Sequence, residues 1–363
     1  MGRALLWLFA ILIVICAVWY LWPAKADPAY WDEPEPPEMT GVLEPRGRLA
    51  QAEQIGAGAV MSSEDIAIGP DGAVYAGQPD GRLVRLRPGS DTVETVADVS
   101  NYPVLGLQWT PEGDLAAMAP DGLYRVNVGT GESELLTNAY DGEPFGFGDD
   151  LDVADDGTIY FTDATSKWGA GSESGPDYVM DMVENRPWGA LYAYHPDTGE
   201  TALLLDNLYF ANGVAMAADG RSVFVAETFR YRIQRYWLDG PNAGAAEIIA
   251  ENLPGIPDGV MSDRQGKLYV AMDTQRSPVL AFLHENPFLT KMITKLPRGL
   301  WLRAGPSSGF VLVMNEEGDY LDSYHDPDGR FGMIANAVPE GEYVWIGSLT
   351  APVIGRYRAP DRQ

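Results

Sequence analysis

The 363-residue sequence has one cysteine, three histidines and few basic residues. With Cys16 alone, an internal disulfide framework and a cysteine-based zinc site are both excluded. Three histidines are too few for histidine-rich metal chemistry. There are 25 Lys and Arg residues against 52 Asp and Glu, which gives a net charge of −27. This balance argues against a nucleic-acid partner, because neutralising phosphates requires a basic face.

The N-terminal segment carries an unbroken apolar run at residues 4–22. A helix of this length approaches the ~30 Å hydrocarbon core of a bilayer. Arg3 precedes the run, and the charges that follow Lys25 are acidic. We therefore predict a single-pass membrane anchor at 1–26, with the N-terminus in the cytoplasm and the rest in the periplasm or at the cell exterior. Alternatively, Ala24-Lys25-Ala26 is a signal-peptide cleavage site and the protein is secreted.

The next segment, residues 27–48, contains five prolines and a series of acidic residues. This composition favours a stiff, extended chain. We predict that it is a spacer that lifts the following domain away from the membrane.

From residue 60 onward a unit of short strands joined by Asp-Gly-like turns repeats about every forty residues. Examples are EDIAIGPDGAVYAGQPDGRLVRL at 64–86 and DGVMSDRQGKLYVAM at 258–272. Such turns between alternating apolar runs indicate β-hairpins. Repetition at this spacing predicts an all-β chain, a six-bladed β-propeller over 49–363. The last unit lacks one strand, so a segment around 49–56 is expected to complete it and close the ring.

Two units are longer than the others. Residues 164–188 extend the third unit, and residues 284–301 extend the fifth. Long insertions in a tight repeat often cap a binding face. We therefore expect both to lie over a ligand site.

The first position of each inner strand should face the mouth of the central channel. The residues at these six positions are Glu64, Gly106, Asp149, Asn212, Asp258 and Asn336. We take Glu64, Asp149, Asn212 and Asp258 as the strong oxygen donors among them. Converging carboxylate and amide oxygens are the ligands that calcium prefers. We predict a Ca²⁺ site there, with Asp150 and Asp152 orienting the ligands from behind.

Simpler interpretations exist for the same residues. Acidic stretches such as 149–156 are usually solvated surface, and Asn212-Gly213 and Asp258-Gly259 are also typical of plain turns. The equivalent position of all four side chains in the repeat favours the metal site.

Several segments together resemble a known family. FGFGDDLDVADDGTIYFTDATSKW at 145–168, NGVAMAADGRSVFVAETFRYRIQRYWLDG at 212–240 and LPGIPDGVMSDRQGKLYVAM at 253–272 are similar to strictosidine-synthase-like proteins. So is the C-terminal stretch at 319–357. That group lies within a wider superfamily that includes gluconolactonases, regucalcin and paraoxonases, all six-bladed propellers. The resemblance covers residues 49–358.

The resemblance implies a calcium ion bound by one Glu, two Asn and one Asp. Matched by motif, these fall on Glu64, Asn212 and Asp258, whereas the first family Asn falls on Asp149. The extra negative charge is expected to tighten cation binding or to raise a carboxyl pKa in the empty site. In hydrolytic members the metal polarises a carbonyl or phosphoryl oxygen and a carboxylate acts as base or nucleophile. For this role we predict Asp258, with a small lactone or aryl ester as substrate.

Two other functions remain open at this stage. The propeller could be non-catalytic, with a structural calcium and a capped face that binds a ligand or a protein. The amine–aldehyde condensation of the plant enzymes needs a Glu that has no recognisable counterpart here, so we do not expect it. His195, His284 and His325 are all expected to be exposed.

Overall fold

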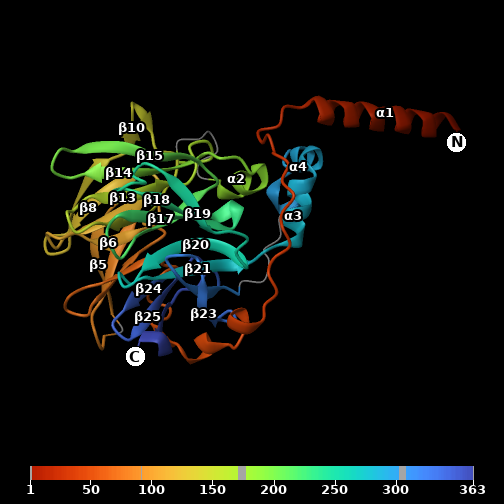
Figure 1. Ribbon diagram of the computed structural model, residues 1–363. Helices are drawn as coiled ribbons and strands as arrows, with labels where there is room; N and C mark the ends of the chain where they lie inside the picture. The colour runs from red at the N-terminus through yellow and green to blue at the C-terminus, as the bar shows by residue number, and fades with distance from the viewer. Residues whose placement is uncertain (1, 91, 171–176, 302–307, 363) are drawn as a thin grey trace.

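The structure is a computed structural model and describes residues 2–90, 92–170, 177–301 and 308–362. Within these residues, six four-stranded antiparallel sheets form the blades of a propeller (Figure 1). Inner strands contact one another in the ring order β2, β6, β12, β16, β20, β24 and back to β2. The predicted six-bladed β-propeller is therefore confirmed.

The strands of blades one to three have the following bounds: β2 Ile66–Ile68, β3 Val74–Gly77, β4 Arg82–Leu86 and β5 Val93–Asp98; β6 Leu107–Trp109, β7 Leu115–Ala119, β8 Gly122–Asn127 and β9 Glu132–Thr137; β12 Gly148–Val153, β13 Ile159–Asp163, β14 Gly189–His195 and β15 Glu200–Leu208. A small hairpin, β10 Ala139–Tyr140 and β11 Glu143–Pro144, lies between blades two and three. The strands of blades four to six are β16 Ala211–Met216, β17 Ser222–Glu227, β18 Arg232–Trp237 and β19 Ala246–Ala250; β20 Gly255–Ser262, β21 Lys267–Gln275, β22 Phe310–Asn315 and β23 Tyr320–His325; β24 Ile334–Glu340, β25 Tyr343–Ser348, β26 Ile354–Arg358 and β1 Glu53–Ile55.

The ring closes through its N-terminal strand. β1 pairs antiparallel with β26, with Glu53 opposite Arg356 and Ile55 opposite Ile354. This pairing confirms that a segment around 49–56 completes the sixth blade. It joins the two ends of the propeller and covers the edge that β26 would otherwise expose.

Apolar side chains fill every interface between neighbouring blades. Each of the six interfaces has its own buried cluster, so the inner strands are covered on both faces. For this reason β7, with the sequence LAAMA, is apolar and buried at every position instead of alternating. Asp-Gly turns connect the strands as expected, for example at Gly157, whose φ of +84° suits glycine.

Both predicted insertions form helices beside the propeller (Figure 1). In blade three, α2 spans Tyr178–Glu184, while residues 171–176 of that insertion lie outside the described residues. In blade five, α3 (Pro278–Glu285) begins before the predicted insertion at 284–301, and Ser277 caps it by accepting a hydrogen bond from the Leu280 amide. The next helix, α4 (Pro287–Ile293), lies within the predicted range. Short 3₁₀ turns complete the structure: η1 Gly41–Leu43, η2 Arg48–Gln51, η3 Thr228–Arg230, η4 Arg298–Leu300 and η5 Pro360–Arg362.

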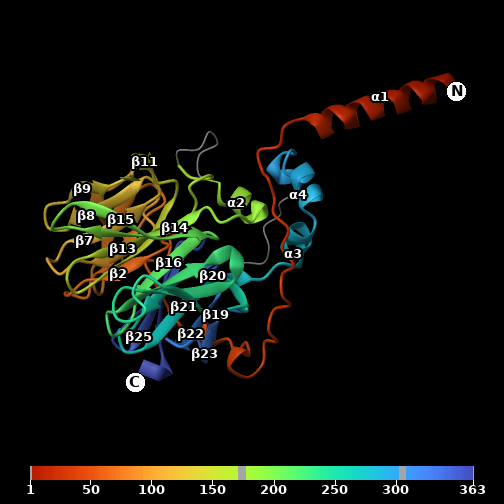
Figure 2. The same ribbon diagram turned by 45° about the horizontal axis from the view of Figure 1, so that its top comes forward.

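The N-terminal apolar run forms α1, Gly2–Leu21, which projects away from the propeller (Figure 2). Among the described residues, which exclude the side chains at 2–4, 6, 12, 15 and 16 within α1, no helix is long and apolar enough to cross a membrane. The membrane anchor stays a prediction.

Residues 26–40, here called the strap, are extended and lie against the propeller (Figure 1). The Ala29 amide donates to the Glu184 carbonyl, and the Trp31 amide donates to that of His284. The Trp31 ring packs on Tyr231 with a centroid distance of 5.5 Å. A free spacer was expected from proline content, which indicates an extended chain but carries no information about what that chain contacts.

Candidate functional site

The four predicted ligands come from four blades and lie at the same end of the central channel. Three of them occupy positions where the strand register shifts. Asp149 lies between the paired residues Gly148 and Leu151, and equivalent shifts contain Asn212 and Asp258. Bulges of this kind re-aim side chains and are common beside functional sites. Glu64 directly precedes Asp65 and the first strand of blade one, β2.

The Asn-Gly and Asp-Gly pairs are parts of strands rather than turns. Gly213 and Gly259 follow their ligands at places where neighbouring blades approach closely. A Cβ on Gly213 would lie 2.1 Å from the amide nitrogen of Val260, and one on Gly259 would lie 2.7 Å from the carbonyl oxygen of Ala335. Glycine is needed there because the backbone of the next blade occupies the space, so the interpretation as plain turns is wrong.

Direct contacts connect the predicted ligands in pairs. The Asn212 side-chain amide donates to Oδ1 of Asp258, and Glu64 shares a hydrogen bond with Asp149. Asp149, Asn212 and Asp258 are buried, whereas Glu64 is partly accessible. Oδ2 of Asp149 and Oδ2 of Asp258 are buried and have no hydrogen-bond partner among the described residues. An unpaired buried carboxylate oxygen is costly, so each of these two atoms calls for a ligand.

Burial and mutual repulsion raise the pKa values of these carboxyls. Burial raises the pKa of Asp258 to about 7, although the Asn212 hydrogen bond acts in the opposite direction. For Glu64 and Asp149, burial and then the neighbouring carboxylates raise the pKa well above its ordinary value. Within the described part of the chain, the charged groups that shift the pKa values of Glu64 and Asp149 most are other carboxylates. A bound cation would stabilise the ionised carboxylates and offset both their burial and their mutual repulsion.

The donor set fits a hard divalent cation. Three carboxylates and one amide supply only oxygen atoms, and two of those oxygens are buried and unpaired. Within the described part of the chain, however, no three Asp, Glu, His or Cys side chains form a recognisable metal cluster. Calcium binding by Glu64, Asp149, Asn212 and Asp258 is therefore still a prediction.

The two residues expected to orient the ligands bond to backbone instead. Oδ2 of Asp150 accepts from the Val214 amide at 3.2 Å, and Oδ2 of Asp152 accepts from the Met216 amide at 2.7 Å. Both amides belong to β16, the strand that carries Asn212. Asp150 and Asp152 thus hold blade four against blade three, and among the described hydrogen bonds neither contacts a predicted ligand side chain.

Sequence reasoning missed a further carboxylate, Asp273. Its Oδ1 is buried without a hydrogen-bond partner among the described residues. Burial, and then the charge of Asp258, raise its pKa well above the ordinary value. Burial and Asp273 also raise the pKa of Tyr178, the first residue of α2, which places α2 beside the channel mouth.

The sequence did contain a signal for Asp273. The second strand of most blades ends in a polar residue after an apolar stretch, as in IYFTD at 159–163, SVFVAE at 222–227 and LYVAMD at 268–273. In two of these blades the polar group caps backbone or pairs with a base: Asp163 accepts from the Phe147 amide, and Glu227 pairs with Arg232. Asp273 breaks this pattern, because one of its oxygens stays unpaired.

The histidines differ from expectation. His195 is exposed as predicted. His284 is fully buried, with Nδ1 2.5 Å from Glu33 and Nε2 2.8 Å from the Met182 carbonyl oxygen. His325 is buried and stacks on Phe310, and burial lowers its pKa to about 4. The local sequence, an insertion around His284 and a turn around His325, did not reveal the segments that cover these two side chains.

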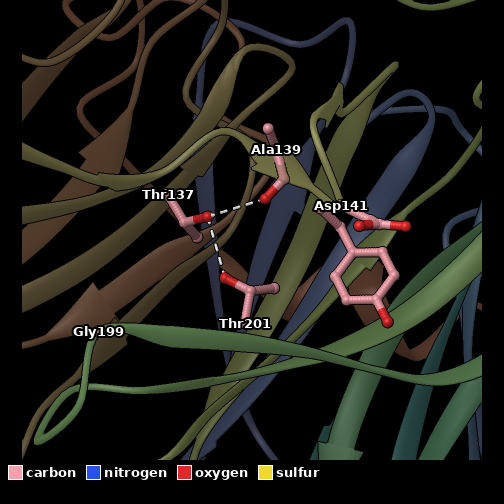
Figure 3. A pocket seen from close by; sticks show the side chains of 6 residues that line it. Thr137, Ala139, Asp141, Gly199 and Thr201 are labelled. Carbon is pink, nitrogen blue, oxygen red and sulfur yellow. Dashed lines mark hydrogen bonds between the residues drawn. The ribbon is translucent and has the colours of Figure 1, made fainter.

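Two hollows lie outside the carboxylate cluster. One, of about 480 Å³, lies at an outer edge between blades two and three, where Thr201 donates to Thr137 at 3.0 Å (Figure 3). None of the predicted ligands lines it. The other, of about 210 Å³, lies between α2 and the end of the blade-five insertion. Its lining includes Trp168, Met180, Leu296, Arg298 and Trp301.

Comparison with known proteins agrees with this architecture. Residues 149–241 match the family model for strictosidine synthase, and residues 41–86 match that for the N-terminal part of strictosidine synthase-like proteins. The adipocyte plasma membrane-associated protein of Gallus gallus is 33% identical over 353 residues, covering 91% of this chain and 83% of that protein. The chain belongs to the strictosidine-synthase-like family. Another relative, strictosidine synthase-like 6 of Arabidopsis thaliana, is 32% identical and covers 83% of this chain and 80% of its own length.

Solved structures place this strictosidine-synthase-like chain among known propellers. A gluconolactonase from Xanthomonas campestris superposes with a TM-score of 0.63 at 20% identity, over 94% of this chain and 99% of that one. Regucalcin, a calcium-binding protein from Agrobacterium tumefaciens, superposes with a TM-score of 0.57 at 14% identity, over 84% and 92%. At these identities the likeness establishes the fold.

Proposed function

We propose that this strictosidine-synthase-like protein is a calcium-dependent hydrolase of small lactones or aryl esters. The observation that carries the proposal is the meeting of four oxygen side chains from four blades, two of them with buried carboxylate oxygens that lack a partner. The structural neighbours described as a gluconolactonase and as calcium-binding regucalcin support it. A bound calcium ion would act as a Lewis acid toward the substrate carbonyl.

Asp258 is the proposed catalytic carboxylate. Asn212 holds one of its oxygens, which fixes the orientation of the side chain and leaves Oδ2 free. A carboxylate with a free oxygen at the channel mouth can take a proton from water or attack a carbonyl. Glu64 and Asp149 complete the cation site from the neighbouring side of the channel.

The surroundings of the mouth favour a substrate with an apolar part. Trp168, Met180 and Trp301 line the hollow beside α2, together with the ion pair of Arg298 and Asp177. A ring carried by an ester or lactone would bury apolar surface there.

The test uses the full chain in a mild detergent, stripped of metal, with a panel of small lactones and aryl esters. Hydrolysis should appear as calcium is added and fall about a hundredfold or more in Asp258→Asn. Asp155→Asn is the matched control, since Asp155 is exposed in the same acidic stretch as Asp149. Unchanged hydrolysis in Asp258→Asn would show that this carboxylate is not the catalytic group.

A structural calcium in a non-catalytic, ligand- or protein-binding propeller is the second candidate. Asp65 and Asp150, which are adjacent in sequence to the predicted ligands Glu64 and Asp149, accept hydrogen bonds from backbone amides of the next blade. This region of the channel therefore already connects neighbouring blades, as a structural calcium would. It predicts that calcium raises the melting temperature while no substrate in the panel is hydrolysed above background.

We also propose that α1 is a membrane anchor, with the N-terminus in the cytoplasm and the propeller in the periplasm or at the cell exterior. The apolar side chains of α1 that are described are exposed, including Leu5, Trp7 and Leu8. Cleavage at Ala24-Lys25-Ala26 would instead release a secreted protein. The electrophoretic mass of the chain isolated from cell membranes distinguishes the two.

A further inference from the structure

The blade-five insertion, residues 278–300, exposes more apolar surface than any comparable stretch of the described propeller. Outside it, the described residues from Glu53 to Arg358 expose large apolar side chains only singly, at Met61, Leu135, Tyr178, Leu203, Ile248 and Leu321. Within its 23 residues, six such side chains are exposed: Val279, Phe282, Phe288, Leu289, Leu296 and Leu300. Contiguous apolar surface of this kind marks an interaction site.

The two helices bury one face and present the other. In α3, Leu280 and Leu283 are buried, while Phe282 is 52% exposed. Leu280 and Leu283 pack with Val183 of α2, so the insertion is fixed to the propeller through its inner face. In α4, Met292 is buried and Phe288 is 66% exposed. The exposed apolar side chains are thus not needed to attach α3 and α4 to the propeller, because other side chains of the same helices already pack against it.

The second helix of the insertion, α4, lies beside the C-terminal end of α1 (Figure 2). Nζ of Lys295 donates to the carbonyl oxygens of Trp19 and Tyr20 at 3.1 and 3.0 Å, which caps the C-terminal end of α1. The Tyr20 and Phe288 rings lie 6.2 Å apart. Aromatic residues at the end of a membrane helix lie at the level of the lipid headgroups. Phe288 therefore lies at that same level when α1 is inserted.

The charges near this face suit anionic headgroups. The whole chain carries a net charge of −27 and has only five lysines, yet Lys25, Lys291 and Lys295 are three of them. Lys291 is partly neutralised by Asp27 at 3.2 Å. Basic side chains beside exposed apolar ones are the pattern of a surface that binds at a bilayer interface.

We propose that the blade-five insertion docks onto the surface of the bilayer that holds α1, with Phe282 and Phe288 in the interfacial layer. The inference rests on the proposed anchorage of α1 and is independent of the hydrolase activity. α3 begins three residues after the end of β21, and this end of β21 pairs with the start of β20, the strand that contains Asp258. Docking of α3 therefore turns the channel mouth toward the lipid. Substrates dissolved in the membrane would then reach Asp258 over a short path.

The test is depth measurement on the full chain in vesicles of phosphatidylcholine with a minority of phosphatidylglycerol. In a Cys16→Ser background, an environment-sensitive fluorophore is attached to Phe282→Cys or to Phe288→Cys. Ile11→Cys reports insertion of α1, and Asp219→Cys, in the exposed turn between β16 and β17, is the water-exposed control. Quenching is compared between lipids that carry a spin label near the headgroup and lipids that carry it deep in the acyl chain, which together give the depth of each position.

We expect blue-shifted emission and strong quenching at positions 282 and 288, deep burial at 11 and neither effect at 219. A quenched label at 11 with unquenched labels at 282 and 288 would overturn the docking and leave the anchor intact. Blue-shifted labels at 282 and 288 that lipid does not quench would show that a protein covers the face, and would also overturn it. An unquenched label at 11 would overturn the anchorage and the docking together.

Discussion

Replacing Asp149 by Asn should stabilise the metal-free protein and weaken its response to calcium. Asp149 is buried, one of its oxygens has no partner, and its carboxyl is repelled by Asp258. Two like charges 4–8 Å apart at an effective dielectric near 20 repel by about 2–4 kcal/mol. At pH 8 without metal, removing one of them should raise the melting temperature by about 4–8 °C, at roughly 2 °C per kcal/mol for a domain of this size.

With calcium present, the difference in stability between Asp149→Asn and wild type should become smaller. Loss of one carboxylate ligand is expected to weaken calcium binding by about tenfold or more. At calcium a hundredfold above the wild-type dissociation constant, wild type gains about 2.7 kcal/mol, and a tenfold weaker variant gains about 1.4 kcal/mol. Differential scanning calorimetry in a chelator and in a calcium series measures both effects on the full chain in detergent.

Asp155→Asn separates these effects from a general change in charge. It removes the same charge from an exposed position of the same blade, so it should leave both melting temperatures nearly unchanged. If Asp149→Asn lowers the metal-free melting temperature, or leaves the calcium response equal to that of wild type, the account of a repulsive, cation-binding cluster is wrong.

Three further predictions follow from other contacts. Burial raises the pKa of both Asp65 and Asp258 to about 7, so between pH 4 and pH 7 the folded metal-free chain holds protons that the unfolded chain releases. Stability should therefore fall as the pH rises through this window, and a urea midpoint in chelator that increases from pH 5 to pH 7 would contradict the assignment. Glu184 is fully buried and accepts hydrogen bonds from both the Trp168 indole and the Lys167 ammonium. Glu184→Ala should therefore lower the free energy of unfolding, measured in urea, by about 3–5 kcal/mol. A decrease below about 1 kcal/mol would refute this role. Trp31→Ala should cost about 2–3 kcal/mol and expose the strap to proteases, whereas an unchanged digestion pattern would mean that its ring contacts do not hold the strap.

Much of the fold could be predicted because it is local and repeated. Each Asp-Gly turn lies within a few residues of the strands it joins, and six similar units can bury their apolar faces only by packing side by side. The segment around 49–56 was predictable as the missing strand for the same reason, since a ring leaves no free edge. The repeat also located Glu64, Asp149, Asn212 and Asp258, because equivalent positions in a symmetric ring converge on its axis.

The tertiary structure decided what depends on contacts between distant segments. Only the fold shows that Asn212 and Asp258 lie in strand bulges, that Asp150 bonds to the next blade, and that Asp273 keeps an unpaired oxygen. The same holds for the strap and for His284, whose partner Glu33 is 251 residues away in the chain. Composition and spacing describe each segment alone, whereas burial and pairing depend on which other segment covers it. Sequence thus determined the repeated frame and the side chains on its axis, and the packing of insertions and strap around that frame could be known only from the folded chain.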